Sequence, residues 1–183
     1  MKKTLCILTL LFSTFSVANA QSNNIKLNIF SPFVRTGSLF YERQVTTGTS
    51  AQLGVFFTRF NIGDTKFSGI GVTPEYHFYV GGEALKGFYL GPYLRFQRFS
   101  VSKDMENASG QTVKAEGVLK TYGGGVIAGY QFVLGKHFTI DPFLGVGYDK
   151  YSLDLKAGRK ENLDVGTFNG ISLRPGLNIG YAF

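Results

Sequence analysis

Residues that commonly perform catalysis are scarce in this chain of 183 residues, which has two histidines, His77 and His137, and a single cysteine, Cys6. A histidine beside a serine and a carboxylate can activate a nucleophile, but two histidines make a poor set of metal ligands. The segment 129–136 superficially resembles a phosphate-binding loop. Its spacing is wrong, however, and no Ser or Thr follows Lys136. The sequence therefore predicts no cofactor, no metal site and no enzyme.

Charged side chains form the other group with chemical potential, because many of them stand where polar and apolar residues alternate. The polar side of these segments carries Lys26, Glu42, Glu75, His77, Arg95, Asp141, Asp149 and Arg174. Acids and bases inside one closed sheet can pair, so we interpret the eight residues as a network of salt bridges and hydrogen bonds that plugs the interior. The alternative is a narrow pore for small solutes, gated by Arg95 or Arg174 exchanging between carboxylates.

The elements that must position these charges are β-strands, and residues 171–183 show the pattern most clearly. Ile171, Leu173, Leu177 and Ile179 alternate with small or polar residues, which indicates a strand with one apolar and one polar face. About 9–11 tilted residues are enough for such a strand to cross a bilayer. The same alternation predicts strands at 25–33, 38–45, 50–60, 67–80, 88–99, 119–134, 138–153 and 171–183.

The even number of strands predicts an all-β fold, an eight-stranded antiparallel up-and-down transmembrane β-barrel. In the second half of the chain short and long connections alternate, as they do where turns lie in the periplasm and loops outside. The bulky face, in a chain with 10 Tyr and 18 Phe, suits lipid, whereas the small polar face suits the narrow interior of eight strands. A soluble lipid-binding barrel, with the apolar face inside, is a weaker alternative.

Four prolines on the apolar side qualify this interpretation. They are Pro74, Pro92, Pro142 and Pro175. Because proline cannot donate a hydrogen bond to a neighbouring strand, we expect a local bulge at each of them.

The N-terminus predicts export. Lys2 and Lys3 precede an apolar run and the sequence Ala18-Asn19-Ala20, which together are typical of a cleaved signal peptide at 1–20 followed by a barrel at 21–183. Cys6 would leave with the signal peptide, so we expect no thiol or disulfide in the mature chain. The formal net charge of +7 then favours an anionic membrane surface rather than nucleic acid as counterpart.

Two segments, Tyr41-Glu42-Arg43 and the stretch 138–148 (FTIDPFLGVGY), together with the strand pattern, resemble a family of small outer-membrane barrels of unknown function. More broadly the chain is similar to small non-porin barrels such as the membrane domain of outer-membrane protein A. The resemblance implies the outer membrane of a Gram-negative bacterium and carries no active site. The C-terminus resembles the strand that the barrel-assembly machinery reads, which implies Tyr181 and Phe183 as an assembly signal.

The outer rim offers candidate contacts. Arg59, Arg98, Lys120 and Lys150 all fall on the apolar side near the predicted extracellular strand ends. Ordinary snorkelling explains such cations, and contact with lipopolysaccharide phosphates is the functional alternative. Polar stretches at 100–117 and 154–170 are predicted loops that could bind an extracellular partner. We therefore expect a structural or surface-interaction protein, with a pore or, less favoured, a lipid-modifying enzyme as alternatives.

Overall fold

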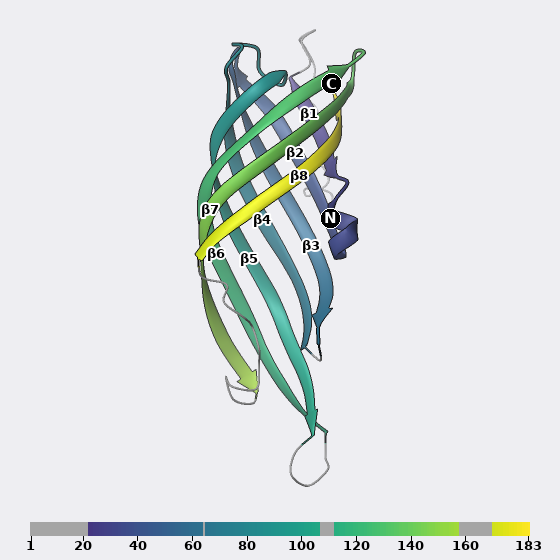
Figure 1. Ribbon diagram of the computed structural model, residues 1–183, viewed down its shortest axis with the longest axis vertical. Coiled ribbons are helices and arrows are strands. Elements are labelled where there is room, and N and C mark those ends of the chain that lie inside the picture. The colour runs from purple at the N-terminus through teal and green to yellow at the C-terminus, as the bar shows by residue number, and fades with distance from the viewer. Residues whose placement is uncertain (1–21, 64, 107–111, 158–169) are drawn as a thin grey trace, which may run out of the picture.

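The computed structural model describes residues 22–63, 65–106, 112–157 and 170–183, so the predicted signal peptide at 1–20 lies outside the described residues. The strands in this part of the chain form one closed barrel in which each pairs antiparallel with its neighbours in sequence (Figure 1). They are β1 (Asn23–Asn28), β2 (Thr36–Thr46), β3 (Thr49–Ile62), β4 (Thr65–Tyr79), β5 (Gly87–Glu106), β6 (Thr112–Leu134), β7 (Phe138–Ala157) and β8 (Gly170–Ala182), with a short 3₁₀ helix, η2 (Ser31–Val34), after β1. The predicted fold is confirmed.

The first and last strands close the ring. β1 pairs with β8 from Asn24↔Ala182 to Asn28↔Asn178. The backbones of Asn23 and Phe183 exchange two further hydrogen bonds of 3.0 and 2.9 Å. Over residues 23–28 and 178–183 this pairing leaves no sheet edge, which a lipid environment favours because it offers no water to unpaired backbone groups.

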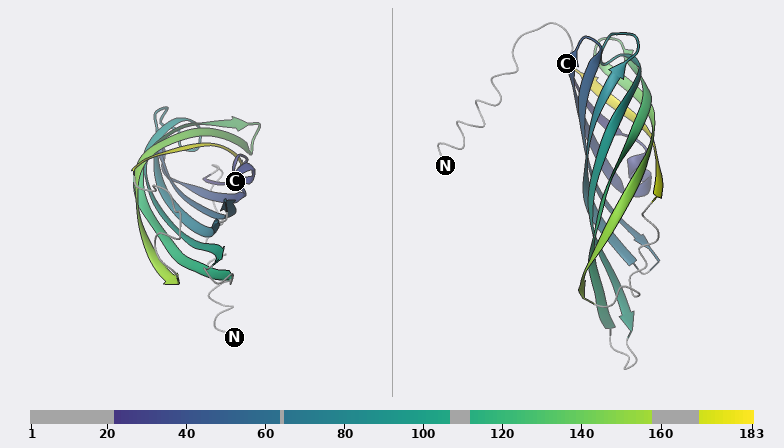
Figure 2. Two further views of the ribbon diagram at one scale, coloured as in Figure 1. Left: turned by 60° about the horizontal axis from the view of Figure 1, so that its bottom comes forward. Right: turned by 90° about the vertical axis from the view of Figure 1, so that its left-hand side faces the viewer.

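The two ends of the barrel differ. One end, here called the turn end, carries both barrel termini and the short connections 47–48, 80–86 and 135–137. The other, the hairpin end, carries η2 and the connections that follow β3, β5 and β7. Figure 2 shows β5, β6 and β7 extending farther at the hairpin end than the remaining strands.

The wall is apolar outside and polar inside. Along β8, Leu173 and Ile179 are 67% and 46% exposed, whereas Arg174 and Asn178 are buried. Leu144 and Val146 on β7 are likewise exposed, at 50% and 42%. No described helix has the length and apolar character to cross a membrane. An aliphatic and aromatic exterior around a charged interior is the reverse of a soluble protein, and it matches a barrel whose strands span a bilayer.

The expected bulges at Pro74, Pro92, Pro142 and Pro175 are wrong. The β4–β5 register is the same before and after Pro74, at Val72↔Phe96 and Glu75↔Tyr93. The described register shifts lie elsewhere, between Gln44 and Thr46 and between Glu116 and Gly117. A proline removes one donor but not the extended backbone, so the flanking hydrogen bonds hold the strand in register. The in-and-out alternation therefore continues through these strands.

Three predicted boundaries also need correction. The segment 100–117 is strand over most of its length, because β5 reaches Glu106 and β6 begins at Thr112. Of the segment 154–170, residues 154–157 belong to β7 and residue 170 to β8, whereas 107–111 and 158–169 lie outside the described residues. Polar composition there marks solvated strands rather than loops. Inside this extension Phe67, Val101 and Leu119 are buried together. The first strand ends at Asn28 instead of residue 33, because Pro32 belongs to η2.

Candidate functional site

The turn-end half of the interior is filled by ion pairs around Lys26. Its Nζ lies 2.7 Å from Glu42 Oε2 and donates to Asp141 Oδ2, also over 2.7 Å. All three side chains are fully buried. They come from β1, β2 and β7, so the pairing spans the seam between β1 and β8. A buried charge is costly unless opposite charge and hydrogen bonds compensate it, and here both do.

His77 on β4 continues the network. Its Nδ1 lies 2.9 Å from Glu42 Oε1 and its Nε2 lies 3.1 Å from Glu75 Oε2. Ionised carboxylate oxygens only accept, so this geometry matches a ring with a hydrogen on both nitrogens, a cation. The ring also stacks on Tyr89 at 4.2 Å between centroids. His77 therefore joins two acids that belong to different strands.

Arg174 on β8 completes the chain of ion pairs, because its Nη2 donates to Glu75 Oε1 over 2.7 Å. The connected charges are then three cations, Lys26, His77 and Arg174, against three anions, Glu42, Glu75 and Asp141. Equal numbers of opposite charge with short contacts form a neutral, packed cluster. We call these six residues the charge network.

Uncharged donors surround the charge network. Tyr79 and Ser50 donate to Glu42, and Tyr89 and Asn178 donate to Asp141. The Tyr79, Tyr89 and Asn178 bonds measure 2.8, 2.9 and 3.1 Å. Sequence reasoning missed these four residues as members, although their polar type at inward positions is the signal that would have found them. They satisfy carboxylate lone pairs that the cations leave over.

The connection 80–86 covers the opening of the barrel at the turn end. Ala84 and Leu85 are buried, at 8% and 4% exposure. Gln131 Nε2 donates to the Leu85 carbonyl over 2.6 Å, and the Ala84 amide donates to the Thr47 carbonyl over 2.6 Å. Leu85 holds a left-handed backbone with φ of 66°, which a residue with a side chain adopts only when its surroundings fix it. This short connection thus folds against the interior.

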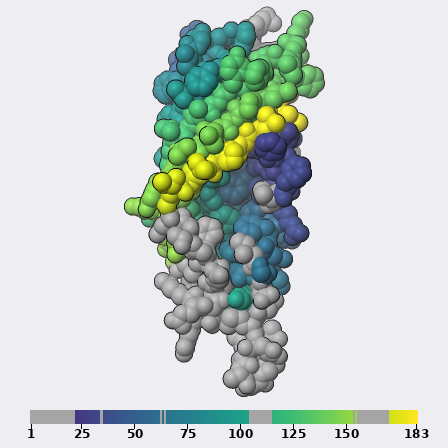
Figure 3. Space-filling model, in the orientation of Figure 1, coloured from purple at the N-terminus to yellow at the C-terminus, as the bar shows by residue number. Residues whose placement is uncertain are grey.

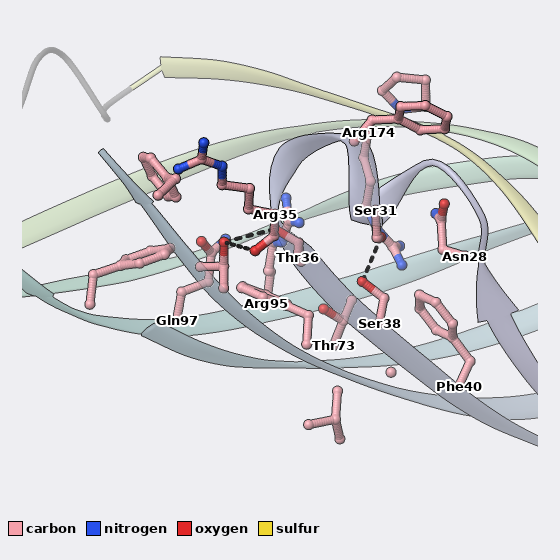
Figure 4. A pocket seen from close by; sticks show the side chains of 18 of the residues that line it. Asn28, Ser31, Arg35, Thr36, Ser38, Phe40, Thr73, Arg95, Gln97 and Arg174 are labelled. Atoms are coloured by element: carbon pink, nitrogen blue, oxygen red, sulfur yellow. Dashed lines mark hydrogen bonds between the residues drawn. The ribbon is translucent and has the colours of Figure 1, made fainter. Parts of the chain in front are cut away.

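The hairpin-end half contains a cavity of about 830 Å³. Figure 4 shows side chains from β2, β4, β5 and β8 converging on it, with Arg35 following η2. The polar lining residues are Asn28, Ser31, Arg35, Thr36, Ser38, Thr58, Asn61, Thr73, Arg95, Gln97 and Arg174. Phenyl rings, including those of Phe40, Phe56 and Phe143, form much of the rest. The described lining residues include three arginines and no acid.

Two of the eight predicted network members stand apart. The guanidinium carbon of Arg95 lies 5.6 Å from the centre of the Phe56 ring, and its buried Nε has no protein acceptor. Asp149 is buried, and its Oδ1 has no hydrogen-bond partner. The structure therefore joins six predicted residues and places Arg95 at the cavity. Arg35, which sequence analysis left in a connection, is the cavity residue it missed.

A family model described as a protein of unknown function, DUF3575, matches residues 5–181. The chain belongs to the DUF3575 family. Comparison of this DUF3575 chain with curated proteins gave no match. Among described residues, no three His, Cys, Asp or Glu side chains are grouped as metal ligands.

Solved structures similar to the DUF3575 chain include outer-membrane barrels. The N-terminal β-barrel domain of Pseudomonas aeruginosa OprF is 15% identical, with 89% of this chain and 98% of that one covered and a TM-score of 0.40. A major outer membrane protein from Thermus thermophilus is 16% identical, with 88% and 99% covered and a TM-score of 0.46. The β domain of the Bordetella autotransporter Brka is 12% identical, with 88% and 97% covered and a TM-score of 0.31.

The exterior of the DUF3575 barrel carries the four predicted rim cations, all exposed. Arg98 on β5 pairs with Lys120 on β6, and Lys150 on β7 pairs with Tyr122 on β6. Lys120 Nζ also lies 2.6 Å from Asp154 Oδ2, with both side chains about half exposed. Three of the four cations therefore lie on adjacent strands, and Arg59 lies on β3.

The C-terminal pair occupies the turn end of the DUF3575 barrel. Tyr181 stacks on His137 at 5.0 Å between ring centres and meets Phe138 edge-on at 5.9 Å. Phe183 keeps 45% of its surface exposed while its backbone pairs with Asn23. His137 Nδ1 lies 2.9 Å from the carbonyl oxygen of Ala182, which accepts its hydrogen bond. His77 and His137 thus lie in separate settings, one inside the barrel and one at its end.

Proposed function

We propose that this protein is an integral barrel of the Gram-negative outer membrane, with its turn end in the periplasm and its hairpin end outside. The apolar exterior, the closed β1–β8 pairing and the greater reach of β5, β6 and β7 at the hairpin end support this topology. A cleaved signal peptide at 1–20 would deliver the chain to the periplasm. Its role is structural or surface interaction rather than catalysis.

One observation carries the proposal that the barrel does not conduct. The ion pairs Lys26–Glu42, His77–Glu42, His77–Glu75 and Arg174–Glu75 connect β1, β2, β4 and β8 across the interior, and their side chains are at most 8% exposed. Eight strands leave an interior that side chains can fill. The charge network therefore acts as a plug, and residues 80–86 narrow the same end.

Planar-bilayer recording of the mature protein tests the plug. The wild type should give no discrete current steps. A Glu42→Ala and Lys26→Ala double variant should give steps if it still folds, because it removes the centre of the charge network. The matched control is Glu83→Ala with Lys86→Ala, which removes an exposed ion pair at the same end. Discrete steps in the wild type would contradict the plug and favour the gated pore.

The extended β5–β6 hairpin supports a surface-interaction role. It projects farther than β2 and β3 at the hairpin end (Figure 1). Projecting segments on a rigid scaffold commonly carry binding. A pull-down from host or bacterial surface fractions, with the hairpin intact and with residues 101–116 replaced by a short turn, tests this role. Binding that survives the replacement would move the partner site elsewhere, for instance to the predicted segment 154–170.

Lipopolysaccharide is the second proposed contact. Arg98, Lys120 and Lys150 lie close together on the exterior near the proposed outer leaflet, where lipid phosphates are dense. Reversing Arg98 and Lys150 to Glu should lower the lipopolysaccharide that copurifies with the barrel. Reversing Arg43, an exposed arginine at the turn end of β2, is the control. Unchanged lipopolysaccharide in the double variant would leave snorkelling as the explanation.

A further inference from the structure

The cavity at the hairpin-end half has an unusual charge composition. Arg35, Arg95 and Arg174 contribute to its lining, and the described lining residues include no carboxylate. Arg174 is neutralised in part by Glu75 on the side of the charge network. Arginines gathered in a concave site with low-dielectric walls create a positive potential that attracts anions. The cavity is therefore positively charged, unlike the neutral charge network in the turn-end half of the interior.

Two of these arginines have donors that the protein does not use. Arg174 is only 8% exposed, yet its Nη1 has no protein acceptor, while Nη2 is bound to Glu75. Arg95 Nε is buried and also has no protein acceptor. Leaving a buried charged donor without an acceptor is costly. Both side chains line the cavity, and a guanidinium group is well matched to the acceptors of a carboxylate or phosphate.

The walls between the arginines are aromatic. The Arg174 guanidinium carbon lies 5.7, 5.5 and 5.0 Å from the ring centres of Phe40, Tyr93 and Phe143, and Arg95 lies over Phe56. These contacts hold both guanidinium groups in place by cation–π attraction. Rings that line a cavity of about 830 Å³ also provide apolar surface for a ligand of ordinary small-molecule size.

We propose that this cavity binds a small amphiphilic anion, whose carboxylate or phosphate is held by Arg95, Arg174 and Arg35 and whose apolar body packs on the phenyl rings. The proposal goes beyond the plug, because Arg95 and Arg35 lie outside the charge network. A plugged barrel with a ligand site open toward the hairpin end can capture a molecule without conducting it.

Arg35 is positioned for this task by its backbone. It adopts a left-handed conformation with φ of 53° as the C-cap of η2. Its amide donates to the Pro32 carbonyl over 2.9 Å, and its own carbonyl accepts from the Arg59 amide over 3.2 Å. Such strain in a residue with a side chain is held only by surrounding contacts and is frequent at ligand sites. Arg35 is exposed and lines the same cavity as Arg95, and in Figure 4 its side chain extends away from that of Arg174.

The wall beside the cavity suggests two sources for the ligand. β1 ends at Asn28, so β8 residues 170–176 have a strand partner on the β7 side alone among the described strands. Figure 3 shows β8 diverging from β1 and η2 toward the hairpin end. Phe33 and Pro175, both exposed on the outside, also line the cavity. An acyl anion from the membrane and a soluble aromatic acid share the proposed chemistry.

Calorimetric titration of the mature barrel in non-ionic micelles tests the proposal. The probes are phenylbutyrate and its neutral analogue phenylbutanol. The acid should bind saturably and the alcohol about tenfold more weakly, because the alcohol loses the charge-assisted hydrogen bonds. Arg95→Gln and Arg35→Gln should each weaken binding of the acid, and Ser38→Phe should weaken it by placing a ring in the cavity that Ser38 lines. Arg43→Gln, the same change on the exterior, should leave its affinity unchanged.

Circular dichroism confirms that each variant is folded before binding is compared. A competition experiment in lipid nanodiscs distinguishes the two sources. If dodecanoate displaces phenylbutyrate, the ligand is an acyl anion from the membrane; if dodecanoate does not displace it, the ligand is a soluble acid. Either result supports an amphiphilic anion. Equal affinity for acid and alcohol overturns the proposal. So does wild-type affinity in both Arg95→Gln and Arg35→Gln, or equal weakening by Arg43→Gln. These experiments measure binding and not conductance, so their results neither support nor contradict the plug.

Discussion

Arg174 Nη2 donates to Glu75 Oε1 over 2.7 Å at the level where the interior changes from packed charge to open cavity. One side chain therefore belongs to two environments. Its Nη2 completes the charge network, while its Nη1 has no protein acceptor and the side chain also lines the cavity. Because Glu75 also lies 3.1 Å from His77 Nε2, the floor of the cavity is fixed through the same carboxylate that holds the histidine.

Replacing Glu75 should therefore destabilise the barrel strongly. Glu75→Gln leaves Arg174 and His77 buried with less compensating charge, and breaking a buried pair in this way costs about 3–5 kcal/mol. Urea unfolding in lipid vesicles measures the change. Glu83→Gln is the matched control, since its pair with Lys86 is exposed and is worth about 0–1 kcal/mol. Equal losses in the two variants would show that the network does not stabilise the fold.

The close approach of β4 and β5 predicts that folding is sensitive to substitution of Gly91. A Cβ at this position would collide with the Tyr76 carbonyl on the neighbouring strand β4. Gly91→Ala should thus prevent correct closure of β4 and β5, with loss of folded protein on refolding into vesicles. Gly81→Ala provides the control, because nothing lies within 4 Å of its Cβ. A Gly91→Ala barrel as stable as Gly81→Ala would contradict this packing.

We expect Phe183 to affect assembly of the barrel more than its stability. Phe183 pairs through its backbone while its ring stays 45% exposed. If the ring is an assembly signal, Phe183→Ala should reduce the amount found in outer-membrane fractions, yet change unfolding in vesicles little, as exposed substitutions usually do. Phe132→Ala, with 48% of its surface exposed on β6, is the control. Normal membrane levels of Phe183→Ala would remove the assembly role.

Much of the fold could be predicted because the alternation of inward and outward side chains along a strand is a local property of the sequence. In β8, Leu173, Ile179 and Arg174 reveal by spacing alone which side faces lipid. The same rule located the inward charges. It could not show that Lys26 meets both Glu42 and Asp141, because this depends on the tilt and stagger of β1, β2 and β7 around the ring.

The remaining differences between the sequence predictions and the structure concern the position of each residue along the barrel axis and the ends of the strands. Arg95 and Glu75 both face inward, but Arg95 pairs across strands with Gly123 and Glu75 with Tyr93, and Arg95 comes to lie over Phe56 at the cavity instead of in the charge network. Alternation has no information about depth. Arg35 was missed because its place depends on η2, whose Pro32 ends the first strand early. The polar residues of β5 and β6 beyond residue 100 suggest a loop because this part of the hairpin keeps its apolar residues, such as Val101, on the inner face.

A double-mutant cycle between Lys26 and Asp141 tests whether the charge network acts as a unit. Lys26→Met leaves Asp141 without a cation and Glu42 with His77 alone, in a fully buried site, and it should cost about 3–5 kcal/mol of unfolding free energy. Asp141→Asn removes the Asp141 charge and keeps one side-chain oxygen, which can accept from either Tyr89 or Asn178. The double variant should be less damaged than the sum of the singles by about 0.5–3 kcal/mol. Simple additivity, measured by urea unfolding in vesicles, would mean that the 2.7 Å contact carries no coupling, and the plug would then rest on packing alone.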